Sequence, residues 1–132
     1  MWNAIPFFEE CLPKFALITK KFSGYDDCER ETRLRAYAKW GFMDLAGRDR
    51  WTNKIEHEII DLIDEELPSD DRWEEYAEAV TAFVSYVYGA LAAKRELGEI
   101  TPQDLQTAHV QLATYDMINM EEIDQVYGKA FD

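Results

Sequence analysis

The stretch from Asp71 to Leu97 constrains the fold of this chain more than any other, because its apolar residues recur at alternating steps of three and four. That spacing places them on one face of an α-helix. From Ala79 to Ala93 the sequence has no charged residue. We therefore expect a helix that is buried on most of its sides, at the centre of the fold. Its apolar face consists of Trp73, Tyr76, Ala77, Val80, Phe83, Val84, Val87 and Leu91.

The opposite face of this helix is built from small residues, namely Ala82, Ser85, Gly89 and Ala93. Side chains of this size let a neighbouring helix approach closely. The uncharged run is shorter than the roughly 20 apolar residues that cross a bilayer. Thr81 and Ser85 also interrupt it. The pattern therefore indicates a core helix and not a membrane span.

Helical periodicity and helix-ending signals recur along the rest of the chain, and strand-like alternation is missing. We predict helices over about 13–22, 26–45 and 50–67 before the central one, a further helix that opens at Pro102, and a short terminal helix near 119–128. Pro13 is placed at a helix start because proline suits the first turn. A chain of 132 residues fits one domain. The predicted fold is an all-α, single-domain bundle over residues 1–132, with five to six helices around a central helix at about 71–97.

Each predicted helix has an apolar face that should point into the core. In the second helix this apolar face consists of Leu34, Tyr37, Ala38, Gly41 and Leu45. In the third helix it consists of Trp51, Ile55, Ile59, Leu62 and Ile63. In the helix after Pro102 it consists of Leu105, Ala108, Leu112 and Tyr115. Trp73, Tyr86 and Tyr88 are expected in the core or at its border. Phe15, Ile18 and Phe22 share a side of the first helix.

Local signals define the start of the helix at Pro102 more clearly than any other boundary. Thr101 is suited to cap the helix, proline follows at the first position, and Asp104 stands three residues after the cap. Ile100 and Leu105 have the spacing of a hydrophobic staple. Before this helix, Leu97 and Gly98 should end the central one, as Gly47 should end the second.

The net charge of −13 is distributed very unevenly. Residues 1–55 hold 8 acidic and 10 basic residues, whereas residues 56–132 hold 19 acidic and 4 basic residues. The acidic band, defined here as Glu56 to Glu78, contains 11 acidic residues and the single cation Arg72. Such a surface repels nucleic acid and anionic lipid, and attracts basic protein surfaces.

Helical bundles commonly bind metals, but this sequence contains no ligand set with the right spacing. A di-iron carboxylate site needs Glu-x-x-His pairs, whereas His57 is preceded at that spacing by Lys54, and His109 by a glutamine. An EF-hand loop over 64–75 would need glycine where Ser69 stands. We therefore expect neither a metal nor a cofactor.

Catalytic motifs are missing as well. The chain has no GxSxG, Walker, GxGxxG or zincin pattern. Cys11 and Cys28 form no CxxC pair, so we interpret them as reduced, partly buried packing residues. The acidic residues are too many, on too many exposed helix faces, for one pair to stand out as a general acid and base. We therefore predict that the protein is not an enzyme.

The acidic band is the feature that suggests a function. Charge runs usually serve solubility, but a surface selected for solubility alone would normally mix the two signs. We therefore interpret the band as a binding surface for a basic protein partner, while a purely solubilising role stays open. The candidate partner-binding residues are Asp61, Asp64, Glu65, Asp70, Asp71, Glu74, Glu75 and Glu78.

In size, helical content and acidity the whole chain resembles the immunity proteins that bacteria make against their own toxins, especially toxins that cleave RNA or DNA. The turn Leu67-Pro68-Ser69-Asp70-Asp71 also resembles one in uncharacterised all-helical bacterial proteins. The first resemblance implies a cytoplasmic protein that binds one cognate toxin and covers its basic active-site cleft. The N-terminus also lacks a signal segment, since Glu9 and Glu10 interrupt any apolar run.

Three functional hypotheses follow. The first is a non-catalytic inhibitor of a basic toxin, in particular a nuclease. The second is a nucleic-acid mimic, of phage or mobile-element origin, that inhibits a DNA-binding enzyme. The third is a metal-dependent hydrolase. A mimic should spread its carboxylates along an elongated surface, whereas the crowding in the acidic band favours the first hypothesis.

Overall fold

The computed structural model describes residues 4–21, 30–66 and 77–113, and all of its regular elements are helical. In chain order they are α1 (Ala4–Lys21), α2 (Arg30–Ala46), the short 3-10 turn η2 (Arg48–Arg50), α3 (Asn53–Glu66), α4 (Ala77–Glu96) and α5 (Pro102–Ala113). The predicted all-α fold is confirmed. The predicted terminal helix near 119–128 lies outside the described residues.

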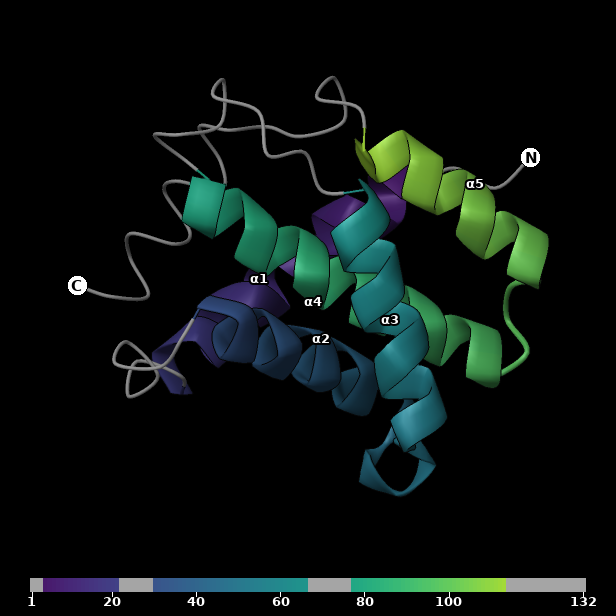
Figure 1. Cartoon of the computed structure of the whole chain (residues 1–132), viewed down its shortest axis with the longest axis horizontal. Helices are drawn as coiled ribbons and strands as arrows, with labels where there is room; N and C mark the ends of the chain where they lie inside the picture. Colours follow the sequence, from purple (N-terminus) through teal and green to yellow (C-terminus); the bar gives the residue numbers. More distant parts are fainter. Residues whose placement is uncertain (1–3, 22–29, 67–76, 114–132) are drawn as a thin grey trace.

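The central position of α4 is confirmed too. It packs against α1, α2, α3 and α5, with α2 as its most extensive neighbour, and Figure 1 shows α3 and α2 on different sides of it. Every residue from Ala82 to Ala93 is buried, including Tyr86 and Tyr88. Among the described helices only α4 is enclosed in this way, which explains why it carries no charge over this length.

Helices α2 and α4 pack with their backbones in direct contact, through Gly41 and Gly89. A Cβ atom added at Gly41 would overlap the carbonyl oxygen of Tyr86, and one added at Gly89 would overlap that of Ala38. The predicted small face of α4 therefore receives α2. Of the predicted inner face of α2, Leu34, Tyr37, Ala38 and Gly41 are buried and Leu45 is half-buried. Phe42, which we did not predict, is buried as well.

The predicted start of the first helix at Pro13 is wrong. Helix α1 begins at Ala4, and Pro13 lies inside it with its ring exposed. An interior proline costs a helix about 3 kcal/mol. Burial of a phenylalanine side chain returns about 1.5 to 3 kcal/mol, and Phe7, Phe8 and Phe15 are all buried on both sides of Pro13. The packing of these rings against the core therefore outweighs the cost of the interior proline. Of the predicted inner side of this helix, Ile18 and Phe22 fall outside the side chains that the structure describes.

The third helix also begins later than the predicted Arg50. Thr52 caps it, because its hydroxyl Oγ1 accepts a hydrogen bond from the backbone N–H of Ile55 at 3.3 Å. Ile55, Ile59 and Ile63 are buried, and Leu62 is half-buried, as predicted. Trp51 precedes the helix and packs edge-on against the Phe42 ring, with 5.2 Å between the ring centroids.

The predicted helix boundaries around residue 100 are confirmed. The N–H groups of Gly98 and Glu99 donate to the carbonyls of Arg95 and Lys94, and Gly98 has φ +76°, as in a Schellman C-cap. Thr101 and Asp104 then form a reciprocal capping box, with both N–H to side-chain oxygen distances at 3.1 Å. Leu105, Ala108 and Leu112 are buried, whereas Tyr115 lies outside the described residues.

Candidate functional site

The described residues include only part of the predicted binding surface. Asp61 lies on α3 with an exposed side chain. Asp64 and Glu65 lie on α3 and Glu78 on α4, at positions where the structure describes the backbone alone. The remaining candidates, Asp70, Asp71, Glu74 and Glu75, fall in the segment 67–76 outside the description. The gathering of the eight carboxylates into one surface therefore stays a prediction.

Helix α3 separates an apolar face from a polar one. Ile55, Ile59 and Ile63 are buried, while His57 and Asp61 are exposed. This separation follows from the 100° step between successive helical residues. Asp61 thus occupies the side of α3 that a protein partner can reach.

One carboxylate of the acidic band is engaged inside the protein. Glu58 lies 2.6 Å from a guanidinium nitrogen of Arg95 at the end of α4, and the same nitrogen lies 3.0 Å from a carboxylate oxygen of Glu96. Arg50 donates to the backbone carbonyl of Glu96 at 3.4 Å. These contacts hold the start of α3 against the end of α4. The acidic band is therefore not uniform, since Glu58 serves the fold.

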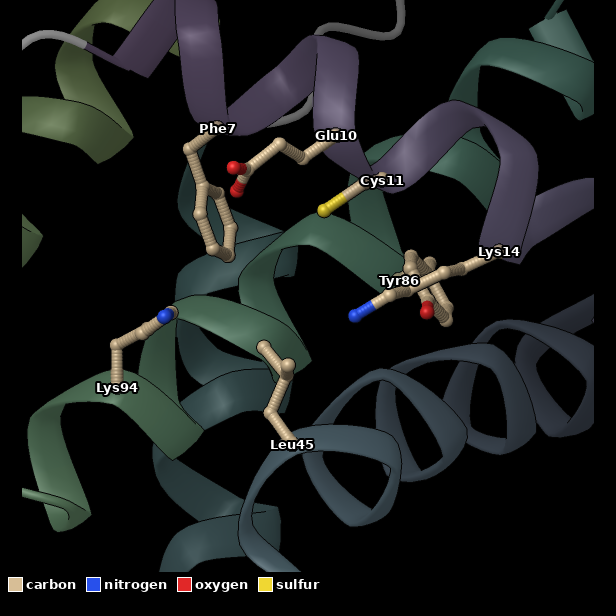
Figure 2. A pocket seen from close by; sticks show the side chains of 7 residues that line it. All are labelled: Phe7, Glu10, Cys11, Lys14, Leu45, Tyr86 and Lys94. Carbon is tan, nitrogen blue, oxygen red and sulfur yellow. The ribbon is translucent and has the colours of Figure 1, made fainter.

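A separate pocket lies where α1, α2 and α4 meet (Figure 2). Its volume is about 280 Å³. Phe7, Cys11 and Tyr86 form its buried wall. The remaining lining comes from Leu45 and from three charged side chains, Glu10, Lys14 and Lys94. This pocket was not predictable from sequence patterns, because its lining combines residues of three helices that are distant in sequence.

Polar contacts fix the charged side chains around the pocket. The Tyr86 hydroxyl donates to Asp44 Oδ2 at 3.1 Å, and Lys14 Nζ lies 3.8 Å from the same oxygen. Lys94 Nζ lies 2.7 Å from Glu99 Oε2 and 5.9 Å from the centroid of the Phe7 ring. Burial raises the pKa of the Tyr86 hydroxyl, and the negative charge of Asp44 raises it further. Tyr86 therefore stays a neutral hydrogen-bond donor.

Cys11 is a buried free thiol, in agreement with its interpretation as a packing residue. Its burial raises the pKa of the thiol from 9.0 to about 12, although Lys14 acts in the opposite direction. Because the thiolate is the nucleophile, a thiol with this pKa is unreactive at neutral pH. Cys28 lies outside the described residues.

His109 has a structural role that the sequence motifs did not predict, since its spacing was tested only for metal ligands. Its side chain is completely buried, and its Nε2–H donates to the backbone carbonyl of Leu62 at 3.0 Å. The ring stacks on Tyr88, with centroids 4.6 Å apart and planes within 8°. His109 thus ties α5 to α3 and α4. Its spacing from Leu105 and Leu112 was the available signal, since all three lie on one helix face.

Within the described ranges, no three His, Cys, Asp or Glu side chains are grouped as metal ligands would be. The helices that the structure describes are also too short or too polar to cross a membrane. The described residues offer two features of different kinds, the exposed carboxylate of Asp61 on α3 and a small pocket between α1, α2 and α4. Comparison of the chain with models of known protein families, with curated proteins and with solved structures finds no match.

Proposed function

We propose that this protein is a non-catalytic inhibitor of the immunity-protein type, which binds a basic cognate toxin in the bacterial cytoplasm. The favoured target is a nuclease domain, because a nuclease presents a basic cleft to the phosphates of its substrate. The acidic band supplies the complementary surface. The observation that carries this proposal is the concentration of 11 acidic residues against one cation between Glu56 and Glu78, in a chain whose first 55 residues are slightly basic.

The geometry of α3 supports this proposal. Three isoleucines anchor one side of the helix in the core, so the helix presents Asp61 on a rigid, well-packed support. Carboxylates on such a support lose little conformational freedom on binding. Like charges gathered on one surface also steer a basic partner and raise its association rate by about 10-fold to 1000-fold at low salt.

The direct test uses the product of the gene next to this one in the source genome. We expect that product to be toxic when expressed alone in a bacterial host and to be harmless when this protein is co-expressed. We also expect the two purified proteins to form a one-to-one complex. A neighbouring product that is not toxic, or that kills despite co-expression, would contradict the proposed function.

The role of the acidic band is tested with two matched triple variants. One neutralises Asp61→Asn, Asp64→Asn and Glu65→Gln on α3. The other neutralises the exposed residues Glu9→Gln, Glu10→Gln and Asp49→Asn outside the band. Both variants lose three negative charges by replacement of carboxylates with amides, so they have the same net charge and differ in where the lost charges lie.

We expect the α3 variant to associate with the toxin about 10-fold more slowly at low salt and with a weaker salt dependence, because rim charges act mainly on the association rate. The control variant should associate almost as fast as the wild type. Stopped-flow or surface-binding kinetics over a range of salt concentrations measure both quantities. Equal rates and equal salt slopes for the two variants would mean that the band serves only solubility.

A further inference from the structure

The pocket between α1, α2 and α4 combines an apolar wall with cationic groups at its edge. Phe7, Cys11 and the Tyr86 ring are buried, and Leu45 closes the side towards α2. Figure 2 shows the ammonium nitrogens of Lys14 and Lys94 on the two sides of one gap, both directed towards it. These side chains start from different helices, so the convergence is a property of the fold.

The charge of the lining is opposite to that of the protein. Among the lining residues Lys14 and Lys94 outnumber Glu10 by one charge, in a chain of net charge −13, whereas three carboxylates surround the two ammonium groups once Asp44 and Glu99 beside the pocket are counted. The carboxylates of Asp44 and Glu99 accept contacts from the two lysines but do not line the pocket. An ammonium group has three N–H donors. Each lysine can therefore keep its carboxylate contact and still donate to a molecule in the gap.

We propose that this pocket binds a small organic monoanion, namely a carboxylate with a flat or branched apolar body. The carboxylate accepts hydrogen bonds from the Lys14 and Lys94 ammonium groups, and the apolar body packs on Phe7, Leu45 and the Tyr86 ring. A volume of about 280 Å³ holds a molecule with one six-membered ring. Binding is non-covalent, because the Cys11 thiol stays protonated at neutral pH. The site is independent of the acidic band and of the proposed toxin partner.

Glu10 gives the proposal a distinctive consequence. Its carboxylate lines the same pocket as the two lysines and therefore repels an anionic ligand. A dianion should bind more weakly than a monoanion of similar size. Loss of a lysine charge should weaken binding, and loss of the Glu10 charge should strengthen it.

Benzoate is the probe, with benzyl alcohol and benzylamine as neutral and cationic analogues of similar shape. Binding to the full chain is followed by the amide shifts of the protein in two-dimensional NMR during titration with each compound. We expect benzoate to bind with a dissociation constant of about 1 mM, with the largest shifts at Phe7, Cys11, Leu45 and Lys94. The two analogues should bind at least about fivefold more weakly, because neither supplies a carboxylate to the lysines.

The variants test the sign of each charge. Lys14→Gln and Lys94→Gln should each weaken benzoate binding about fivefold, and Glu10→Gln should strengthen it about threefold. The controls are Lys39→Gln and Glu9→Gln, exposed positions outside the pocket lining, which should leave the affinity unchanged. An unchanged amide spectrum of each variant without benzoate, away from the replaced residue, confirms that the fold is intact.

Four results would overturn the proposal. The first is that no benzoate binding is detected at a concentration ten times the expected dissociation constant of about 1 mM. The second is that the largest amide shifts lie outside the pocket, and the third is that benzyl alcohol binds as tightly as benzoate. The fourth is that Lys39→Gln weakens benzoate binding as much as the two pocket lysine variants do.

Discussion

Helix α4 has two contrasting contacts, one with α2 through the glycine pair and one with α1 across the pocket. At Gly41 and Gly89 the backbones of α2 and α4 touch, and there is no room for even one additional carbon. Near Tyr86 and Lys94 the same helix borders a gap of about 280 Å³. The first contact has no space for a larger side chain, whereas the second has space for a small ligand.

The contrast shows that burial alone does not decide whether a residue supports close helix packing or lines a pocket. Tyr86 belongs to both regions, since its backbone carbonyl faces Gly41 while its side chain lines the pocket. The close contact with α2 fixes the backbone of α4, from which the Tyr86 and Lys94 side chains reach the pocket on the α1 side. A binding site supported by a close-packed contact of this kind needs little rearrangement when it is occupied.

The largest effect is expected from a charge placed in the close-packed region. Val84→Asp would put a carboxylate at a position with no exposed surface, at a cost of at least about 4 kcal/mol. Because the total stability of a domain is about 5 to 15 kcal/mol, such a loss removes a large part of it, and we expect a strongly destabilised or unfolded protein. Val110→Asp is the matched control, because Val110 is 53% exposed on α5. Circular dichroism during heating compares the two, and similar melting curves would contradict the assigned environments.

The second prediction tests the glycine contact directly. Gly89→Ala would improve helix propensity by about 1 kcal/mol, yet the added Cβ would overlap the Ala38 carbonyl. Because backbone atoms of a packed helix cannot turn aside, we expect a net loss of about 3 kcal/mol. Urea unfolding measures the change, with the exposed Gln106→Ala on α5 as the control. A Gly89→Ala variant as stable as the wild type would show that α2 and α4 are further apart.

The third prediction concerns the pocket wall, and its effect is absent at neutral pH and appears only at alkaline pH. The pKa of Cys11 is raised from 9.0 to about 12, so between these values the unfolded chain releases a proton that the folded protein retains. The folded state therefore loses stability as the pH rises, by up to about 1.4 kcal/mol per pH unit for one such group. The raised pKa of Tyr86 acts in the same direction above pH 10.0.

We therefore expect Cys11→Ala to reduce the decline of stability between pH 9.0 and about 12, without abolishing it. Urea unfolding at a series of pH values measures the slope for the wild type and the variant. Thiol alkylation of Cys11 in the folded protein at neutral pH should also be much slower than in urea. Parallel stability profiles for the two proteins would contradict the burial of the thiol.

Local interactions made much of the fold predictable from the sequence. The capping box at Thr101 and Asp104 joins residues three apart, and the helix end at Gly98 needs only its own neighbours. The apolar face of α4 was evident because helical periodicity is a property of successive residues. The exposure of Asp61 on α3 followed from the same periodicity.

Tertiary structure alone decided the rest, because the contacts concerned join residues that the sequence keeps far apart. Tyr86 meets Asp44 across 42 positions, and Arg95 meets Glu58 across 37. Which side chains meet in this way depends on where two helices cross, and Gly41 and Gly89 fix the crossing of α2 and α4 that brings Tyr86 to Asp44. The continuation of α1 through Pro13 has the same origin, since the energy that overrides the local break comes from rings packed against other helices. The sequence by itself determined the all-helical fold and the apolar faces of the helices, and the packing of α1 and α2 against α4 decided which side chains share a pocket.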